Sequence, residues 1–129
     1  MFSRRSAATD KQLLGNAAEA RALAHLQQQG LRLVERNYRV ARGPNARGGE
    51  IDLICSAPDG TLVFVEVRAR ADASHGGAAA SIGLAKQRSL VRAARHYLRR
   101  FATLPPCRFD VVAIDGQALE WLPGAFDAG

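Results

Sequence analysis

The sequence predicts a single α/β domain in which a mixed five-stranded sheet is flanked by two main helices. Three observations lead to this prediction. The chain has 129 residues, which is enough for one hydrophobic core and too few for two. Segments with helical and strand-like spacing follow one another in the order α, β, β, β, α, β, β. No repeat, low-complexity tract or linker interrupts them, so we expect residues 1–129 to form one domain with flexible ends at about residues 1–9 and 124–129.

The first third of the chain contains a helix, a strand and a loop. Residues 9–30 start with a capping Thr-Asp pair and are rich in alanine, and Gly30 stands where a glycine commonly follows the end of a helix. Residues 31–40, "LRLVERNYRV", have the composition of a strand. Residues 41–49, "ARGPNARGG", combine Gly, Pro and Asn with arginine, so we expect an exposed basic loop.

Two hairpins and a second helix complete the predicted fold. Residues 50–56 and 61–70 are strand-like runs joined by a "PDG" turn, which is a hairpin signal. A small-residue connector at residues 71–83 leads into a helix over about residues 83–101, which ends before "LPP". The runs "CRFDVVAI" and "LEWL" then form a second hairpin around "DG".

The composition excludes several classes of protein. Hydrophobic residues make up 47% and charged residues 23%, which is ordinary for a globular protein. No apolar run approaches the roughly 18 residues of a membrane-spanning helix, and the start lacks the apolar region of a signal peptide. We therefore expect a cytoplasmic protein with no membrane partner. Cys55 and Cys107 lack metal-ligand spacing, and so do the three histidines, which argues against zinc.

Three carboxylates interrupt the apolar runs of the first hairpin, and a fourth lies on the first helix. Helical spacing puts Glu19 on the inward face of its helix. Strand alternation puts Glu50 and Asp52 on one side of their strand, and Glu66 on the same side as Arg68 in the next strand. A three-residue turn places Asp52 directly opposite Glu66, whereas a two-residue turn places them on opposite faces. The length of the "PDG" turn therefore decides whether these two acids meet.

Two interpretations of the carboxylates stay open at this level. A hard divalent ion takes oxygen ligands and would relieve the repulsion between Asp52 and Glu66. The first-helix glutamate and the carbonyl of Val67 are further candidate ligands. Alternatively, the acids of the first strand pair with Arg68 or Arg70 as solvated salt bridges across the sheet.

The second predicted helix carries a basic stripe. Its arginines recur at spacings of four, three and four, and no acidic residue lies between Lys86 and Arg100. Such a stripe favours phosphate as a partner, although a solvated helix face has the same pattern. Lys86 and Gln87 break the apolar face at the start of the helix, so we expect them to point toward the carboxylates. The residues predicted to contact nucleic acid are the stripe and one loop arginine: Arg88, Arg92, Arg95, Arg99 and Arg47.

Several short motifs together resemble the YraN-like family of bacterial proteins, a family of uncertain function. They are "GNAAEARALAHLQQQG", "RGGEIDLI", "LVFVEVRAR", "GGAAASI", "KQRSLVRAARHYL" and "CRFDVVAI", and they cover about residues 13–123. That family is similar in turn to Holliday-junction resolvases and to the PD-(D/E)XK, restriction-endonuclease-like superfamily. The resemblance implies an α/β/α core whose metal site lies on the central hairpin.

The resemblance also implies roles for particular residues. Asp52 and Glu66 correspond to the metal-binding acids of the superfamily, and Glu19 to the supporting glutamate of the first helix. Arg68 occupies the position of the usual lysine, and because arginine stays protonated it can stabilise charge but cannot act as a base. Lys86, with Gln87 beside it, is the candidate to replace that lysine and position the nucleophile. Glu50 is expected to form a salt bridge near the basic loop before it.

The function that follows from the resemblance is a Mg- or Mn-dependent nuclease that hydrolyses phosphodiesters in branched or otherwise structured DNA. A homodimer would suit such a role. The first alternative is a non-catalytic nucleic-acid-binding protein that retains the nuclease fold. A weaker alternative is a scaffold protein whose basic face meets an acidic protein. The net charge of +6 agrees with an acidic partner in all three cases.

Overall fold

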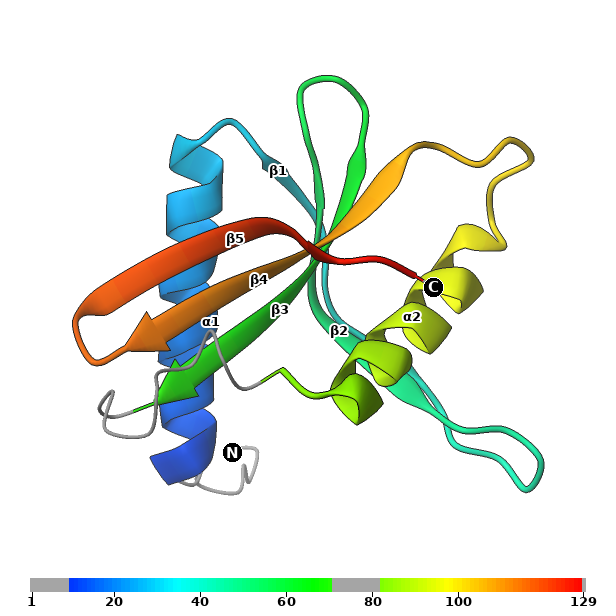
Figure 1. The fold of residues 1–129 in the computed structure, drawn as a ribbon, viewed down its shortest axis with the longest axis horizontal. Coiled ribbons are helices and arrows are strands. Elements are labelled where there is room, and N and C mark those ends of the chain that lie inside the picture. Colours follow the sequence, from blue (N-terminus) through cyan, green and yellow to red (C-terminus); the bar gives the residue numbers. More distant parts are fainter. Residues whose placement is uncertain (1–9, 71–81, 129) are drawn as a thin grey trace, which may run out of the picture.

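A computed structural model of the protein describes residues 10–70 and 82–128, and it confirms the predicted order of elements. Residues 1–9 and most of the connector predicted at residues 71–83 lie outside the described residues. Figure 1 shows the arrangement of the chain. The elements are α1 (Asp10–Gln28), β1 (Arg32–Val40), β2 (Gly49–Ser56), β3 (Leu62–Arg70), α2 (Leu84–Leu98), β4 (Cys107–Asp115) and β5 (Ala118–Phe126).

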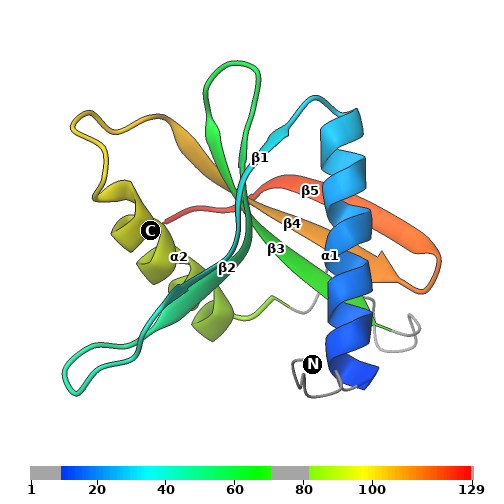
Figure 2. The same ribbon diagram turned by 180° about the vertical axis from the view of Figure 1, so that it is seen from behind.

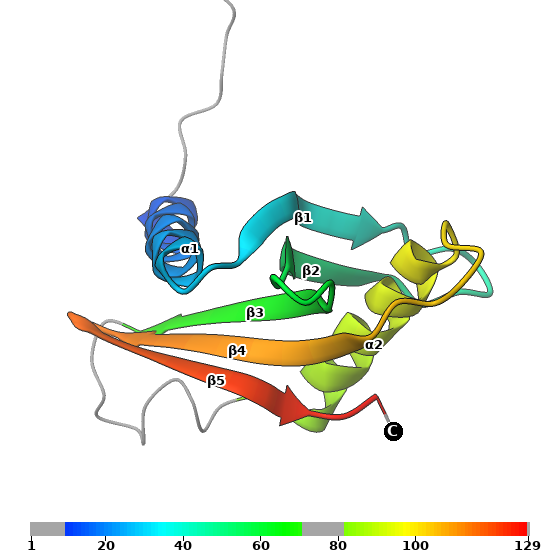
Figure 3. The same ribbon diagram turned by 90° about the horizontal axis from the view of Figure 1, so that it is seen from above.

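The five strands form one mixed sheet in the order β1-β2-β3-β4-β5. The β3 and β4 strands are parallel, and every other neighbouring pair is antiparallel. One helix packs on each face of the sheet, as the view from above shows (Figure 3). The predicted α/β fold with a mixed five-stranded sheet and two helices is therefore correct. None of the described helices combines the length and apolar character that crossing a membrane requires.

Each helix buries the face that its spacing predicts. Ala18, Ala22 and Leu26 of α1 are buried against the β2, β3 and β4 strands. On the other face of the sheet, α2 buries Leu90 and Tyr97 against the neighbouring aromatic and aliphatic side chains of the strands. Each face of the sheet thus has its own hydrophobic core. Residues at the edges of the two helices can contact the sheet outside these cores.

The β2–β3 hairpin has the longer of the two predicted turns. The Ala57 N–H donates to the Thr61 carbonyl over 2.9 Å, which leaves a three-residue loop. Paired residues run from Ser56 and Leu62 to Leu53 and Val65, where the pairing stops. Beyond that point β2 continues alongside β1, whereas β3 continues alongside β4. The two strands thus separate into a fork, which is visible from both sides of the molecule (Figures 1 and 2).

A glycine pair at the start of β2 lets α2 approach the sheet closely. A Cβ atom on Gly49 would lie 2.4 Å from the carbonyl oxygen of Ser89 and 3.2 Å from the backbone nitrogen of Ala93. A Cβ atom on Gly48 would lie 2.6 Å from the carbonyl oxygen of Val40. The second glycine of the "GG" before "EID" therefore allows α2 to contact the start of β2, whereas the first allows the close return of the chain past Val40.

Substitution of Gly49 should destabilise the fold. In Gly49→Ala the added methyl group meets helix backbone, which cannot rotate away, so we expect a loss of about 1–3 kcal/mol in the free energy of unfolding. Urea unfolding measures this loss. Gly43→Ala is the matched control, because its Cβ would come no closer than 3.9 Å to its neighbour, the Ala46 Cβ. Equal stability of the two variants would contradict the close contact.

The last strand is longer than the sequence predicts. It reaches Phe126, so it includes part of the stretch that we expected to be a flexible end. The cause is Asp110 of β4, which is 1% exposed and whose carboxylate accepts hydrogen bonds from Arg108 Nε, Trp121 Nε1 and the Gly124 N–H. The bonds from Trp121 and Gly124 span the irregularity in the β4–β5 pairing and hold the end of β5 against the sheet.

Candidate functional site

Two carboxylates face each other at the fork between β2 and β3. The hairpin register places Asp52 across from Glu66, one position beyond the last paired residues, Leu53 and Val65. Asp52 Oδ2 accepts a hydrogen bond from the Val67 N–H over 2.8 Å. This side-chain bond joins β2 to β3 just beyond the last pair of residues whose backbones are paired. Glu66 is 2% exposed. The three-residue turn has therefore brought together the two acids whose meeting depended on it.

Glu66 has an unusual environment for an acid. Within the described part of the chain, its Oε1 atom is buried with no hydrogen-bond partner. Burial, the negative charge of Asp52 and a hydrogen bond that protonated Glu66 shares with Asp52 raise the pKa of Glu66 to about 8. Lys86 and Arg68 oppose this rise, with nitrogens 3.5 Å and 3.6 Å from Glu66 Oε2. The pair Asp52–Glu66 thus holds a proton at neutral pH unless another cation replaces it.

Lys86 links the buried acid to the surface. Its Nζ lies 3.5 Å from Glu66 Oε2 and 3.4 Å from Glu50 Oε1. The other oxygen of Glu50 lies 3.4 Å from Arg39 Nε. Lys86 therefore points toward the carboxylates as predicted. Glu50 is paired with Arg39, which lies on the strand before the basic loop, and with Lys86.

Glu19 approaches the pair from α1. Burial and the negative charge of Asp52 raise the pKa of Glu19, whereas the charge of Arg36 and a side-chain hydrogen bond from Asn37 lower it. Asn37 has a φ of 52°, a left-handed backbone conformation that is rare for residues other than glycine. Such conformations often occur near functional sites. Through its hydrogen bond to Glu19, Asn37 adds a residue of β1 to the group formed by Glu19, Asp52 and Glu66.

The donor set fits a hard divalent ion held by two carboxylates. Among residues 10–70 and 82–128, no three His, Cys, Asp or Glu side chains converge as a metal-binding group. Asp52 and Glu66 nevertheless offer only oxygen, and one oxygen of Glu66 lacks a partner. Mg²⁺ and Mn²⁺ are commonly held by one or two carboxylates, with water and substrate oxygens as the other ligands. The residues present therefore fit such an ion with two direct ligands, and Glu19 fits a supporting position better than a third ligand.

The other predicted residues are divided among several places. The side-chain amide nitrogen of Gln87 donates to the Ile82 carbonyl, which ties it to the start of α2. Gln87 also lines an open depression of about 430 Å³ along α2 that includes Leu84, Val91 and Asp127. The predicted arginines that line the same depression are Arg88, Arg92 and Arg95.

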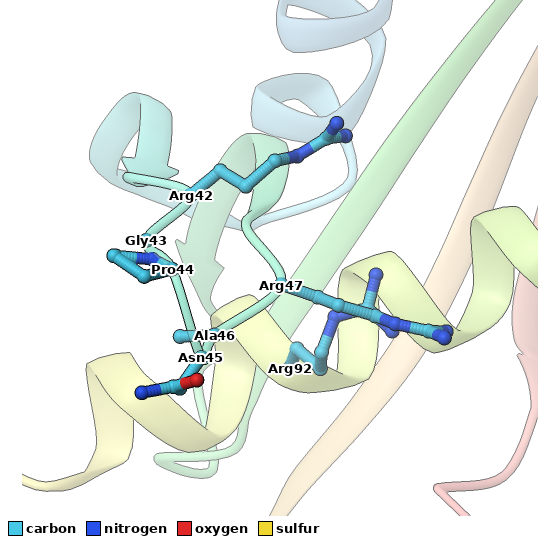
Figure 4. A pocket seen from close by; sticks show the side chains of 7 residues that line it. All are labelled: Arg42, Gly43, Pro44, Asn45, Ala46, Arg47 and Arg92. Atoms are coloured by element: carbon cyan, nitrogen blue, oxygen red, sulfur yellow. The ribbon is translucent and has the colours of Figure 1, made fainter.

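A second depression lies between α2 and the loop that joins β1 to β2. Arg47 and Arg92 line it together (Figure 4). Arg99 follows the last turn of α2 as its capping residue, and its side chain is exposed. Three arginines of the predicted stripe thus share one surface along α2, and one of them, Arg92, also reaches the second depression.

Sequence reasoning missed several residues around the site. Asn37 was read only as part of a strand, because a left-handed residue inside a strand leaves no signal in the composition. Arg39 and Arg42 belong to a basic segment that the sequence does show, but their relation to Glu50 and Arg92 depends on the packing of α2. Asp110 could have been noticed as an acid within an apolar run, although its role is to hold β5.

Comparison with known proteins gives the family. The model of the uncharacterised protein family UPF0102 matches residues 18–114. A UPF0102 protein of Methylibium petroleiphilum is 66% identical, with the match covering 89% of this chain and 94% of the relative. UPF0102 proteins of Albidiferax ferrireducens and Cupriavidus taiwanensis are each 62% identical, over 93% and 92% of this chain and 91% and 86% of their own lengths. This finding agrees with the family resemblance seen in the motifs, and the chain belongs to the UPF0102 family.

Proposed function

We propose that the protein is a metal-dependent nuclease that hydrolyses phosphodiesters in branched or otherwise structured DNA. The observation that carries this proposal is the pair Asp52–Glu66, in which a carboxylate that is 2% exposed lies beside a second acid and has a raised pKa. A purely structural ion pair would not need the second acid. Keeping a buried acid beside a second one costs stability, and such costs are typically retained where a ligand is bound.

Asp52 and Glu66 would hold the ion, and Glu19 would support it from α1. A divalent ion there would supply positive charge to the phosphate and lower the pKa of a bound water. The chain's own groups then have separate tasks. Arg68, whose guanidinium lies beside Glu66, would stabilise negative charge on the phosphate, because it remains protonated at all relevant pH values.

Lys86 is the candidate for the task of the usual lysine. It comes from α2 and not from β3, yet its Nζ reaches the same carboxylate as Arg68 does. The Lys86 ammonium, in contact with two acids, would orient the attacking water by donating a hydrogen bond to its oxygen and could give a proton to the leaving oxygen, while the proton of the water would pass to solvent. Lys86 therefore compensates for the arginine at position 68 in this proposal.

Replacement of Lys86 should lower the rate and leave DNA binding largely intact. For Lys86→Gln we expect cleavage to fall by about 100-fold or more, the contribution typical of a positioned proton-transfer group. Arg88→Gln is the matched control, because Arg88 is an exposed cation on the same helix and lines the α2 depression. It should weaken binding with little change in the maximal rate. Equal losses of maximal rate in both variants would contradict the assigned role of Lys86.

The proposed function is tested by incubating purified protein with single-stranded, nicked, flapped and four-way DNA in the presence of Mg²⁺ or Mn²⁺. We expect cleavage of one or more structured substrates, and loss of that cleavage when a chelator removes the metal. Binding to these substrates without cleavage under any of these conditions would favour the alternative, a nucleic-acid-binding protein that retains the fold but does not cut.

A further inference from the structure

The segment between β1 and β2 forms a protruding arm, defined here as residues 41–48. It extends beyond the end of α2 in two opposite views of the molecule (Figures 1 and 2). Gly43 and Ala46 are joined by a pair of backbone hydrogen bonds of 2.9 Å and 3.3 Å, so the tip is closed as a tight turn. Arg42 and Arg47 flank that turn, one on each side, and Figure 4 shows that their side chains leave the arm in different directions, with that of Arg47 running toward Arg92.

An open depression of about 580 Å³ lies between the arm and α2. Arg42 and Arg47 line it from the arm, and Arg92 lines it from the helix (Figure 4). We name these three residues the arginine cradle. Arg92 Nε donates to the Gly48 carbonyl over 3.0 Å, which joins the helix to the base of the arm. Gly49, the next residue, packs directly against the backbone of α2, so the position of the arm relative to α2 is fixed by the fold.

The cradle has positive charge without an acidic partner. Within residues 10–70 and 82–128, no carboxylate lies at ion-pair distance from Arg42, Arg47 or Arg92, whereas Arg39 nearby is paired with Glu50. Guanidinium groups bind phosphate oxygens in a bidentate manner, and several of them around one open depression suit a phosphate group better than a single carboxylate.

A neighbouring depression connects the cradle to the carboxylates. It is about 390 Å³ in size, shares Arg42 and Arg92 with the first, and also includes Arg39 and Glu50. Glu50 contacts Lys86, which in turn contacts Glu66. A series of charged side chains therefore leads from the cradle through Glu50 and Lys86 to the buried Glu66 at the fork between β2 and β3. A chain with regularly spaced phosphates could contact both ends of this series.

We propose that the arginine cradle is a second phosphate-binding site, which holds a backbone phosphate of a nucleic acid strand away from the phosphodiester at Asp52 and Glu66. This inference rests on the proposed function for the identity of the strand. A protein partner is less suited to the cradle, because its lining contains no aromatic or large aliphatic side chain to anchor an interface. The nucleic acid strand must then extend from the phosphodiester that is hydrolysed at Asp52 and Glu66 as far as the arm.

Fluorescence anisotropy with labelled single-stranded DNA, duplex DNA and single-stranded RNA tests the cradle. The measurements are made in a chelator, so that no cleavage occurs, and over about 50–200 mM salt. For duplex DNA, Arg42→Ala/Arg47→Ala should reduce the slope of log affinity against log salt by about 1, the value for loss of one phosphate contact, and each single variant should reduce it by less. Arg32→Ala is the control for charge, because Arg32 is exposed at the opposite end of β1 and should leave the slope unchanged.

Arg42→Lys/Arg47→Lys separates charge from folding, because it keeps both positive charges and should retain most of the slope. A double alanine variant that binds all three nucleic acids with the wild-type slope would overturn the cradle. Equally tight, cradle-dependent binding of poly-glutamate would overturn its assignment to phosphate. Neither result bears on the carboxylate pair, which is tested separately by metal binding.

Discussion

Asp52→Asn should abolish DNA cleavage while leaving DNA affinity equal to that of the wild type or higher. The substitution removes one of the two acids that would hold the metal. Loss of a residue that only supports a metal ligand costs up to about 100-fold, so loss of a direct ligand should lower the rate by at least about 100-fold. Asparagine keeps an oxygen that can accept the hydrogen bond from the Val67 N–H, so the fork should stay folded. Affinity should not fall, because a negative charge beside the phosphate disappears.

Asp59→Asn is the matched control for this result. It makes the same chemical change in the same hairpin, where Asp59 Oδ1 accepts a hydrogen bond from the Thr61 N–H that asparagine can also accept. Cleavage and affinity are measured for both variants under single-turnover conditions with Mn²⁺. Cleavage that survives in Asp52→Asn would show that the activity comes from another site or from a contaminating enzyme.

Glu66→Gln should change how the stability of the metal-free protein depends on pH. The pKa of Glu66 is raised from 4.5 to about 8 in the folded state, so the folded protein binds a proton more tightly than the unfolded chain. The resulting stability is fully present below about pH 4.5 and is lost as pH rises toward 8. Within that window one such proton contributes a slope of at most about 1.4 kcal/mol per pH unit.

The expected result is that Glu66→Gln removes much of this slope and is more stable than the wild type at about pH 8, where the wild type carries a buried charge. Urea unfolding in a chelator, repeated across the pH range, measures the effect. Glu120→Gln, an exposed substitution on β5, corrects for the change in net charge. Parallel pH profiles for the wild type and Glu66→Gln would contradict the proton held at the fork. A stabilised but inactive Glu66→Gln would instead be typical of a functional site kept at the expense of stability.

Hydrophobic periodicity and turn residues were sufficient to predict the order of elements. Gly30 ends the first helix with a φ of 95°, and the buried face of α2 follows its apolar spacing. The meeting of Asp52 and Glu66 was also within reach of the sequence, because strand alternation leaves only the turn length undecided. The structure resolves that single choice in favour of the three-residue turn.

The surroundings of the pair depend on tertiary packing and could not be predicted. Glu50 pairs with Lys86 only because Gly49 allows α2 to lie against the start of β2. The left-handed Asn37 beside Glu19 reflects local backbone geometry that no spacing rule detects. Helical spacing placed Arg88, Arg92 and Arg95 on one surface, but it gave no sign that Arg92 also meets the arm, because that contact depends on how α2 packs.

The central claim is that Asp52 and Glu66 bind a divalent metal ion, and a calorimetric titration of the metal-free protein with Mn²⁺ near neutral pH tests it most directly. Since Glu66 holds a proton there, binding should release protons, which is seen as a dependence of the heat on the buffer. We expect a single site with proton release in the wild type, and loss of that site in both Asp52→Asn and Glu66→Gln. Absence of Mn²⁺ binding in the wild type, or undiminished binding in both variants, would contradict it.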